Sequence, residues 1–144
     1  AARFWYPIGL ALAGGRLYVA DQISHTIRAI DLGTAAVTTL AGAAGQDGTD
    51  DGVGPAARFF GPQGLTTDGR RLYVADSANH TVRQIDIATA AVTTLAGTPQ
   101  RPGCQDGWAP AAGFYRPLDL IYDTQRACLY ISDSSNNCIR RLGR

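Results

Sequence analysis

The sequence predicts an all-β fold built from three copies of one short-stranded unit. All 13 Lys-or-Arg positions are Arg and all 12 acidic residues are Asp, and Lys, Glu and Met are absent. The missing residues are good helix formers, whereas Asp favours caps and turns. Short runs rich in Val, Ile, Thr and Tyr alternate with clusters of Gly, Pro, Asp and Asn, which is typical of strands joined by turns.

An internal repeat is the strongest single observation. Ala-Arg-Phe at 2–4 returns at 57–59 and, as Ala-Gly-Phe, at 112–114, a spacing of 55 residues each time. Further matches follow in the same order: Leu-Tyr-Val-Ala-Asp at 17–21 and 72–76, Leu-Tyr-Ile-Ser-Asp at 129–133, and Ala-Val-Thr-Thr-Leu-Ala-Gly at 36–42 and 91–97. Matches this numerous and colinear indicate three copies of one structural unit.

Each copy predicts four short strands, which in the first copy span 8–13, 16–20, 26–31 and 36–40. The turns between strands carry Gly-Gly, Asp-Gly, Ser-His and Asn-His, which suit tight reversals. The second strand of the second copy is apolar on both faces, because Leu72 and Val74 alternate with Tyr73 and Ala75. A sheet covered on one side only should alternate apolar and polar residues, so each sheet is expected to lie between two others.

Residues 72–83, Leu-Tyr-Val-Ala-Asp-Ser-Ala-Asn-His-Thr-Val-Arg, resemble the core of an NHL repeat. Thr-Thr-Leu-Ala-Gly followed by Asp-Gly, Ala-Ala-Arg-Phe and Pro-Gln-Gly-Leu fits the same family, and the resemblance covers essentially the whole chain. It implies a β-propeller, commonly six-bladed, whose first strands line a central channel. The period is too long for WD40 repeats, and their Trp-Asp signature is absent.

The expected architecture is a partial NHL-repeat propeller over residues 1–144. Its four-stranded antiparallel blades are expected at about 3–42, 58–97 and 113–144, and the last lacks its outer strand because the third copy ends first. Many propellers build one blade from both chain ends. By that resemblance the chain looks like the C-terminal half of a six-bladed ring, with the missing strand supplied from elsewhere.

Partner expectations follow from three blades that do not close a ring. Exposed apolar faces and an unpaired strand edge at 140–142 invite contact with another chain. The expected partner is protein, either a second copy in a three-plus-three arrangement or the remainder of a larger protein, and glycan is possible. The formal net charge of +1 gives no reason to expect nucleic acid. No apolar run approaches the ~20 residues of a membrane span.

Two sets of repeated charged residues are interpreted as structural because they recur in every copy. An Asp ends the second strand, where it is expected to accept hydrogen bonds from the backbone of the following turn. An Arg seven residues later is expected to bridge neighbouring blades. These positions are Asp21, Asp76, Asp133, Arg28, Arg83 and Arg140. The turn histidines, His25 and His80, are expected to serve turn packing.

Positions that depart from the repeat are the candidates for ligand binding. Asp119 stands where the other copies have Gly9 and Gly64, beside the expected channel mouth. Trp108, Tyr115 and Arg116 are candidates for a binding patch on the loop face. Asp47, Asp50 and Asp51, in a Gly-rich loop, are weak candidates for calcium, because their spacing is not that of an EF-hand.

The cysteines leave one candidate disulfide. Cys128 and Cys138 lie at opposite ends of one hairpin, too far apart for a bond that needs Cα atoms within ~7 Å. Cys104 and Cys138 are both expected at the loop face and are the candidate pair. A bond between them would indicate an oxidising, for example extracellular, compartment.

The function expected from these observations is that of a non-catalytic binding or scaffold module for protein or glycan, without a cofactor. The first alternative is half of a six-bladed enzyme of the metal-dependent lyase or lactonase type, whose site needs clustered ligands at the channel. The second alternative is a purely structural domain within a large complex.

Overall fold

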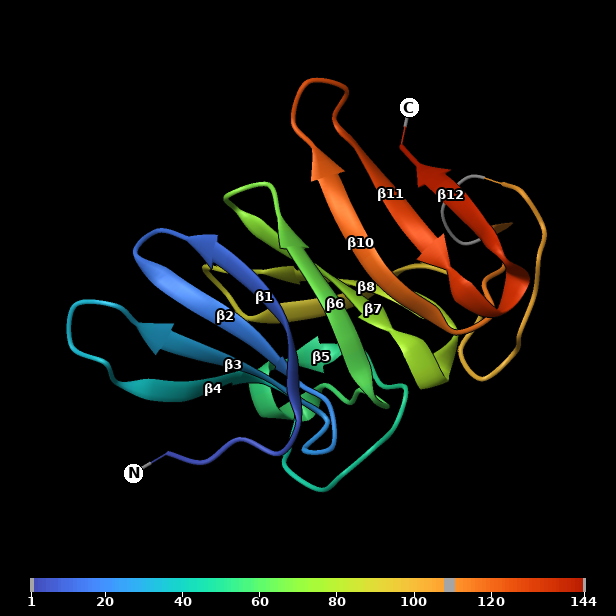
Figure 1. Ribbon diagram of the computed structural model, residues 1–144. Helices are drawn as coiled ribbons and strands as arrows, with labels where there is room; N and C mark the ends of the chain where they lie inside the picture. Colours follow the sequence, from blue (N-terminus) through green and yellow to red (C-terminus); the bar gives the residue numbers. More distant parts are fainter. Residues whose placement is uncertain (1, 108–110, 144) are drawn as a thin grey trace.

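The computed structural model describes residues 2–107 and 111–143, and it confirms the all-β fold class (Figure 1). Regular structure in these residues consists of strands and three single-turn 3₁₀ helices, η1 (Gly54–Ala56), η2 (Ser77–Asn79) and η4 (Ser134–Asn136). The last two form the turn between the second and third strands of their blades, where an Asx-rich sequence favours a local reversal.

The strands form three antiparallel sheets, one for each sequence repeat, which we call blades 1, 2 and 3. Blade 1 contains β1 (Pro7–Ala13), β2 (Arg16–Asp21), β3 (Thr26–Asp31) and β4 (Val37–Ala41). Blade 2 contains β6 (Pro62–Thr67), β7 (Arg71–Asp76), β8 (Thr81–Asp86) and β9 (Ala91–Ala96). Blade 3 contains β10 (Pro117–Asp123), β11 (Cys128–Asp133) and β12 (Cys138–Leu142). In the described residues, blade 3 therefore has three strands, as expected.

Blade 2 has a fifth strand that the sequence did not predict. The two-residue strand β5 (Gly52–Val53) lies on the outer edge of β9, with Gly52 opposite Val92 and Val53 opposite Ala91. A strand this short shows no alternation of apolar and polar residues, so periodicity gave no signal. It ties the loop between blades 1 and 2 to the rim of blade 2.

The blades stack face to face, with β1, β6 and β10 side by side along the inner edge (Figure 1). One apolar cluster fills the junction of blades 1 and 2 and contains Leu72, and a second fills the junction of blades 2 and 3 and contains Tyr73. Neighbouring residues of one strand thus serve opposite junctions. For blade 2, this confirms the expectation that a sheet is covered on both faces.

Glycine lets the inner strands approach closely. A Cβ at Gly9 would overlap the carbonyl oxygen of Gln63, and a Cβ at Gly64 would lie 2.5 Å from Cα of Asp119. Because these neighbours are backbone atoms, they cannot move aside as a side chain could. The two internal junctions therefore depend on glycine at one inner-strand position.

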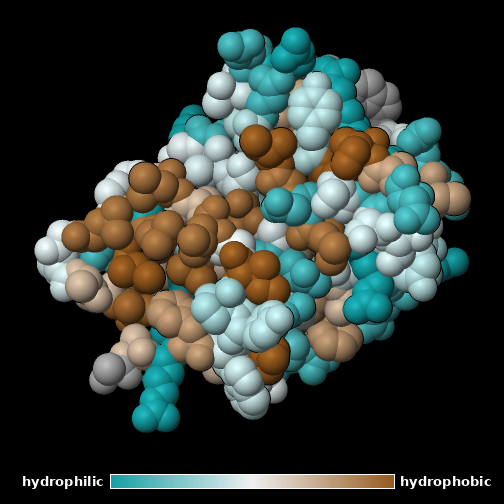
Figure 2. All heavy atoms as spheres, in the orientation of Figure 1, coloured by the Kyte–Doolittle hydropathy of each residue, from teal (hydrophilic) through white to brown (hydrophobic). Residues whose placement is uncertain are grey.

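The outer faces of blades 1 and 3 are open in the described structure, and they expose apolar residues that the internal junctions bury. Leu10 is 59% exposed, whereas its repeat equivalents Leu65 and Leu120 are 5% and 6% exposed. On blade 3, Ile139 is 70% exposed, whereas the equivalent Val82 is fully buried. Figure 2 shows hydrophobic residues gathered over blade 1. We call these two surfaces the open faces.

Candidate functional site

Each blade contains a buried Asp carboxylate, and the ion pair of this Asp with Arg is shortest in blade 2. Asp76 Oδ1 accepts the backbone N–H of Phe60 at 2.8 Å, and its Oδ2 accepts hydrogen bonds from Asn79 Nδ2 at 2.8 Å and Arg83 Nη1 at 2.9 Å. The prediction that the following turn supplies backbone donors was wrong, because the backbone donor lies just before β6. Burial raises the pKa of Asp76 to about 6, although Arg83 lowers it in turn.

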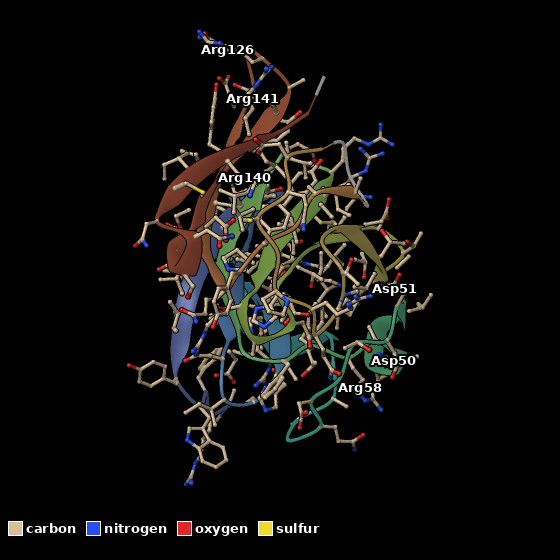
Figure 3. All side chains as sticks on the ribbon, turned by 90° about the vertical axis from the view of Figure 1, so that its right-hand side faces the viewer. Asp50, Asp51, Arg58, Arg126, Arg140 and Arg141 are labelled. Atoms are coloured by element: carbon tan, nitrogen blue, oxygen red, sulfur yellow. The ribbon has the colours of Figure 1, made fainter. Side chains whose placement is uncertain are left out.

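Arg83 ties blade 2 to the loop that connects it with blade 1. Its Nη1 donates to the carbonyl of Arg58 at 2.8 Å, and its Nη2 to the carbonyl of Asp50 at 3.0 Å and Oδ1 of Asp51 at 2.8 Å. The guanidinium lies 5.2 Å from the centre of the Phe59 ring. Figure 3 shows Asp50, Asp51 and Arg58 together on this loop. The expectation was that this Arg bridges neighbouring blades, and Arg83 does so through the loop that connects blades 1 and 2.

The Asp–Arg pair recurs in blades 1 and 3, with longer distances between the charged atoms. Asp133 and Arg140 are 3.1 Å apart, whereas Asp21 and Arg28 are 3.8 Å apart. Blade 1 has Ser24 where blade 2 has Asn79. Oδ2 of Asp21 is buried without a hydrogen bond among the described residues. All three carboxylates are fully buried. Their contacts support the structural interpretation of the repeated Asp and Arg positions.

The calcium candidates do not converge in the structure. The carboxylate of Asp51 is engaged by Arg83 and by the hydroxyl of Thr94 at 3.0 Å, whereas Asp50 contributes its carbonyl oxygen. No group of three or more metal-ligating side chains occurs in residues 2–107 and 111–143. A calcium site that includes Asp47 stays a prediction, with Asp51 already committed to an ion pair.

The turn histidines connect consecutive blades. Nδ1 of His25 accepts the backbone N–H of Gly61, and Nδ1 of His80 accepts that of Arg116, both at 3.1 Å. The rings also contact Phe60 and Tyr115 edge-on, with centroids 5.6 Å and 5.3 Å apart. These contacts couple blades, which the expectation of turn packing alone did not include.

The His80 contact predicts a pH-dependent junction between blades 2 and 3. Burial, with the nearby charge of Arg116, lowers the pKa of His80, whereas Asp133 raises it less. A His with a lowered folded-state pKa stabilises fully above its unfolded pKa of about 6.5 and loses that stability as the pH falls. The wild type should gain unfolding free energy between pH 5 and 7, because protonation in acid removes the acceptor of the Arg116 backbone N–H. In His80→Asn we expect this gain to be smaller by about 1 kcal/mol.

The measurement is urea denaturation of both proteins across this pH range. Asn is the matched replacement, because Asn137 occupies the equivalent left-handed position in blade 3. Asp76 acts in the opposite sense, since its raised pKa favours the native state below about 6. Only the difference between the proteins therefore reports on His80. Equal pH slopes would contradict a role for its neutral ring.

Asp119 lies where a groove of about 550 Å³ meets the open face of blade 3. The groove runs along the inner strands and is lined by residues such as Ile8, Leu10, Leu65 and Ile121. Asp119 is its single charged lining residue among those described. Its Oδ1 accepts the backbone N–H of Leu120 at 2.9 Å. The groove therefore combines aliphatic side chains with polar groups such as Gln63 and Thr66, and carries one carboxylate.

An aromatic side chain stands at the same repeat position before each inner strand. These residues are Trp5, Phe60 and Tyr115, and all three are exposed. Arg116 follows Tyr115 with φ of 54°, the left-handed conformation that Tyr6 and Gly61 adopt in the other repeats. Tyr115 and Arg116 stay binding candidates, and Trp5 and Phe60, which the sequence suggests as surface residues, are exposed at the equivalent position. Trp108 lies outside the described residues.

All three cysteines are free in this structure. Cys104 and Cys138 are exposed and Cys128 is buried. Cys138 pairs with Asp133 at one end of the β11–β12 hairpin, and Cys128 begins β11 at the other. The candidate Cys104–Cys138 disulfide stays a prediction, which peptide mapping without reducing agent would test.

The described part of the chain contains no helix with the length and hydrophobicity of a membrane span.

Comparisons with known proteins agree on the repeat. The family model described as NHL repeat matches residues 59–85. NHL repeat-containing protein 2 of Bos taurus is 37% identical over 153 residues, covering 98% of this chain and 21% of the relative. Protein SUPPRESSOR OF QUENCHING 1, chloroplastic, of Arabidopsis thaliana is 34% identical over 147 residues, covering 95% and 14%. The chain thus spans about a fifth or less of these curated relatives.

The fold comparison gives the same result. An auxiliary nutrient binding protein from Bacteroides thetaiotaomicron, solved by crystallography, superposes with a TM-score of 0.81 and 27% identity. The match covers 95% of this chain and 37% of that protein. It includes the stacking of successive sheets, which sequence identity alone does not establish. The chain contains an NHL repeat, is similar over nearly its whole length to NHL repeat-containing proteins, and folds as consecutive β-propeller blades.

Proposed function

We propose that this chain is a non-catalytic protein-binding module, whose three blades form one arc of a larger propeller. The observation that carries the proposal is the difference in exposure between equivalent residues. Leu10 and Ile139 are exposed at positions that are buried wherever a neighbouring blade is present. Burying one such aliphatic side chain stabilises a protein by about 1.5–3 kcal/mol. Covering the open faces with polypeptide is therefore strongly favourable.

The aromatic residues before the inner strands supply a contact surface on the loop face of the same arc. Trp5, Phe60 and Tyr115 repeat at the spacing of the blades, so the stacking spreads them along the arc. Exposed aromatic and Arg side chains contribute disproportionately to protein interfaces, and Arg116 adjoins this row. The row supports protein as the ligand, and glycan remains the alternative occupant. The enzyme and purely structural alternatives stay predictions.

The experiment is sedimentation velocity of the chain at about 1–100 µM, the range in which moderate interfaces associate. We expect concentration-dependent self-association, because each copy can cover an apolar open face of the other. Leu10→Asp and Ile139→Asp should each weaken it, because a carboxylate on an open face must be desolvated on contact.

Val53→Asp is the matched control. Val53 is also exposed and apolar, but it lies on β5 at the outer rim of blade 2, away from both open faces. Its substitution should leave association unchanged. A wild-type chain that remains monomeric over the whole range, with no binding of a hydrophobic dye, would contradict the proposal.

A further inference from the structure

The loop face carries the same histidine contact at both internal junctions, but the residues that complete it differ. At the junction of blades 1 and 2, the turn histidine meets Phe60 and Gly61. At the junction of blades 2 and 3, it meets Tyr115 and Arg116. The geometry is nearly identical, with hydrogen bonds of 3.1 Å and angles of 74° and 76° between the rings. Both blades of each junction are present, so neither contact depends on an open face.

The contact between blades needs only part of what Tyr115 and Arg116 provide. It consists of one backbone N–H and one aromatic ring, which Phe60 and Gly61 already supply. The second residue has φ of 63° in Gly61 and 54° in Arg116. Glycine adopts this left-handed conformation without strain, whereas a residue with a Cβ adopts it at a cost in free energy. A strained residue whose side chain the fold does not require points to a function for that side chain.

The unpartnered polar groups at this junction are hydrogen-bond donors. Nδ1 of His80 accepts the backbone N–H of Arg116, so the proton of the neutral ring is on Nε2. This Nε2, the hydroxyl of Tyr115 and the guanidinium of Arg116 have no hydrogen bond or ion pair within residues 2–107 and 111–143. Tyr115 is 41% exposed and Arg116 is exposed. We call these three residues the Tyr115 site.

The charges around the Tyr115 site favour an acidic ligand. The carboxylates of Asp106 and Asp133 both pair with Arg140, so they leave the charge of Arg116 unmatched. Arg101, earlier in the same connecting loop, is exposed and likewise forms no ion pair with a described residue. A guanidinium binds a carboxylate through two parallel N–H groups, and such charge-assisted hydrogen bonds are stronger than neutral ones. A carboxylate is therefore the complementary ligand group.

We infer that the Tyr115 site binds an acidic segment of a protein partner. An Asp or Glu carboxylate of that segment pairs with Arg116 and accepts a hydrogen bond from Nε2 of His80, and a neighbouring apolar side chain packs on the ring of Tyr115. This rests on the proposed protein-binding function and names the chemistry of its ligand at one point of the loop face. Exposed Tyr and Arg are the residue types that contribute most to protein interfaces, which favours polypeptide as the occupant.

The ligand chemistry is tested with a random 12-residue peptide library displayed on phage. Peptides are selected on the wild-type protein, and those that also bind the double variant Tyr115→Phe, Arg116→Gly are discarded. This variant reproduces the residues of the other junction, so its resistance to urea should at least match that of the wild type. The retained peptides should be enriched in Asp and Glu.

The most enriched peptide, labelled with fluorescein, is then titrated by fluorescence anisotropy. Arg116→Gly should bind it about tenfold more weakly, because a charge-assisted hydrogen bond is lost. Raising the salt concentration from about 0.05 to 0.5 M should weaken binding to the wild type much more than binding to Arg116→Gly. Arg70→Ala is the matched control, because it removes the same charge from an exposed turn at the other end of the β6–β7 hairpin. It should bind as tightly as the wild type.

Retained peptides without acidic residues, or equal binding to Arg116→Gly and the wild type, would overturn the inference. An array on which acidic glycans bind through Arg116, when no peptide does, would overturn it as well. In each of these cases, self-association that depends on Leu10 and Ile139 would leave the proposed function standing. A wild-type chain that neither associates, nor binds hydrophobic dye, nor selects peptides would instead remove the proposed function. The two failures are therefore distinguishable.

Discussion

Asp76→Ala is expected to lower the free energy of unfolding by about 3 kcal/mol, because Arg83 loses its buried counter-charge and keeps only the ion pair with the half-exposed Asp51. The side chain of Arg83 is 1% exposed, so water cannot replace the lost carboxylate. The backbone N–H of Phe60 loses its acceptor in the same change. Urea denaturation followed by tryptophan fluorescence or circular dichroism measures the loss.

Two controls separate this mechanism from a general effect of the substitution. Asp21→Ala should cost less, because Arg28 is 17% exposed and can be hydrated when its partner is removed. Adding Arg83→Met to Asp76→Ala should recover part of the loss, since the uncompensated charge disappears. The coupling would be contradicted if Arg83→Met lowered the stability of Asp76→Ala by as much as it lowers that of the wild type.

Phe59→Ala is expected to destabilise the protein by about 3–5 kcal/mol, the usual cost of deleting a buried aromatic ring. Phe59 is fully buried in the junction of blades 1 and 2, and Arg83 lies over its ring. Both the apolar contacts and the support of the guanidinium would be lost. The unfolding free energy in urea is again the measurement.

Phe4→Ala provides a control that the repeat itself supplies. Phe4 occupies the position of Phe59 and lies 5.3 Å from the guanidinium of Arg28, but it borders the open face of blade 1 and is partly exposed. Its removal should cost clearly less, because less apolar area returns to water. Equal losses would show that burial between blades does not determine the stability of this position.

The local structure was predictable from the sequence. The four strands of blade 1 begin and end within one residue of the expected ranges, because alternating apolar residues and turn residues act over short distances. The incomplete third blade was also expected, since the repeat alignment locates it directly. The resemblance to NHL repeats followed from the 72–83 block, and the comparisons confirmed it.

The contacts that complete the blades were not predictable. The backbone N–H of Phe60, which donates to Asp76, lies 16 residues before it. The backbone N–H of Gly61, which donates to His25, lies 36 residues after it, so neither of these two hydrogen bonds is part of a local motif. The strand β5 likewise exists only because the connecting loop meets the rim of β9.

The sequence by itself determined the repeat, its resemblance to NHL repeats, the strands and the residues that face each side of a sheet. Only the tertiary structure decided how the Asp76–Arg83 pair is buried within blade 2, which histidine contacts join the blades, and where Asp119 lies. The physical reason is the distance along the chain over which each effect acts. Strand periodicity and turn chemistry depend on adjacent residues, whereas these contacts depend on how closely whole sheets stack, which Gly9 and Gly64 of the inner strands permit at the two junctions.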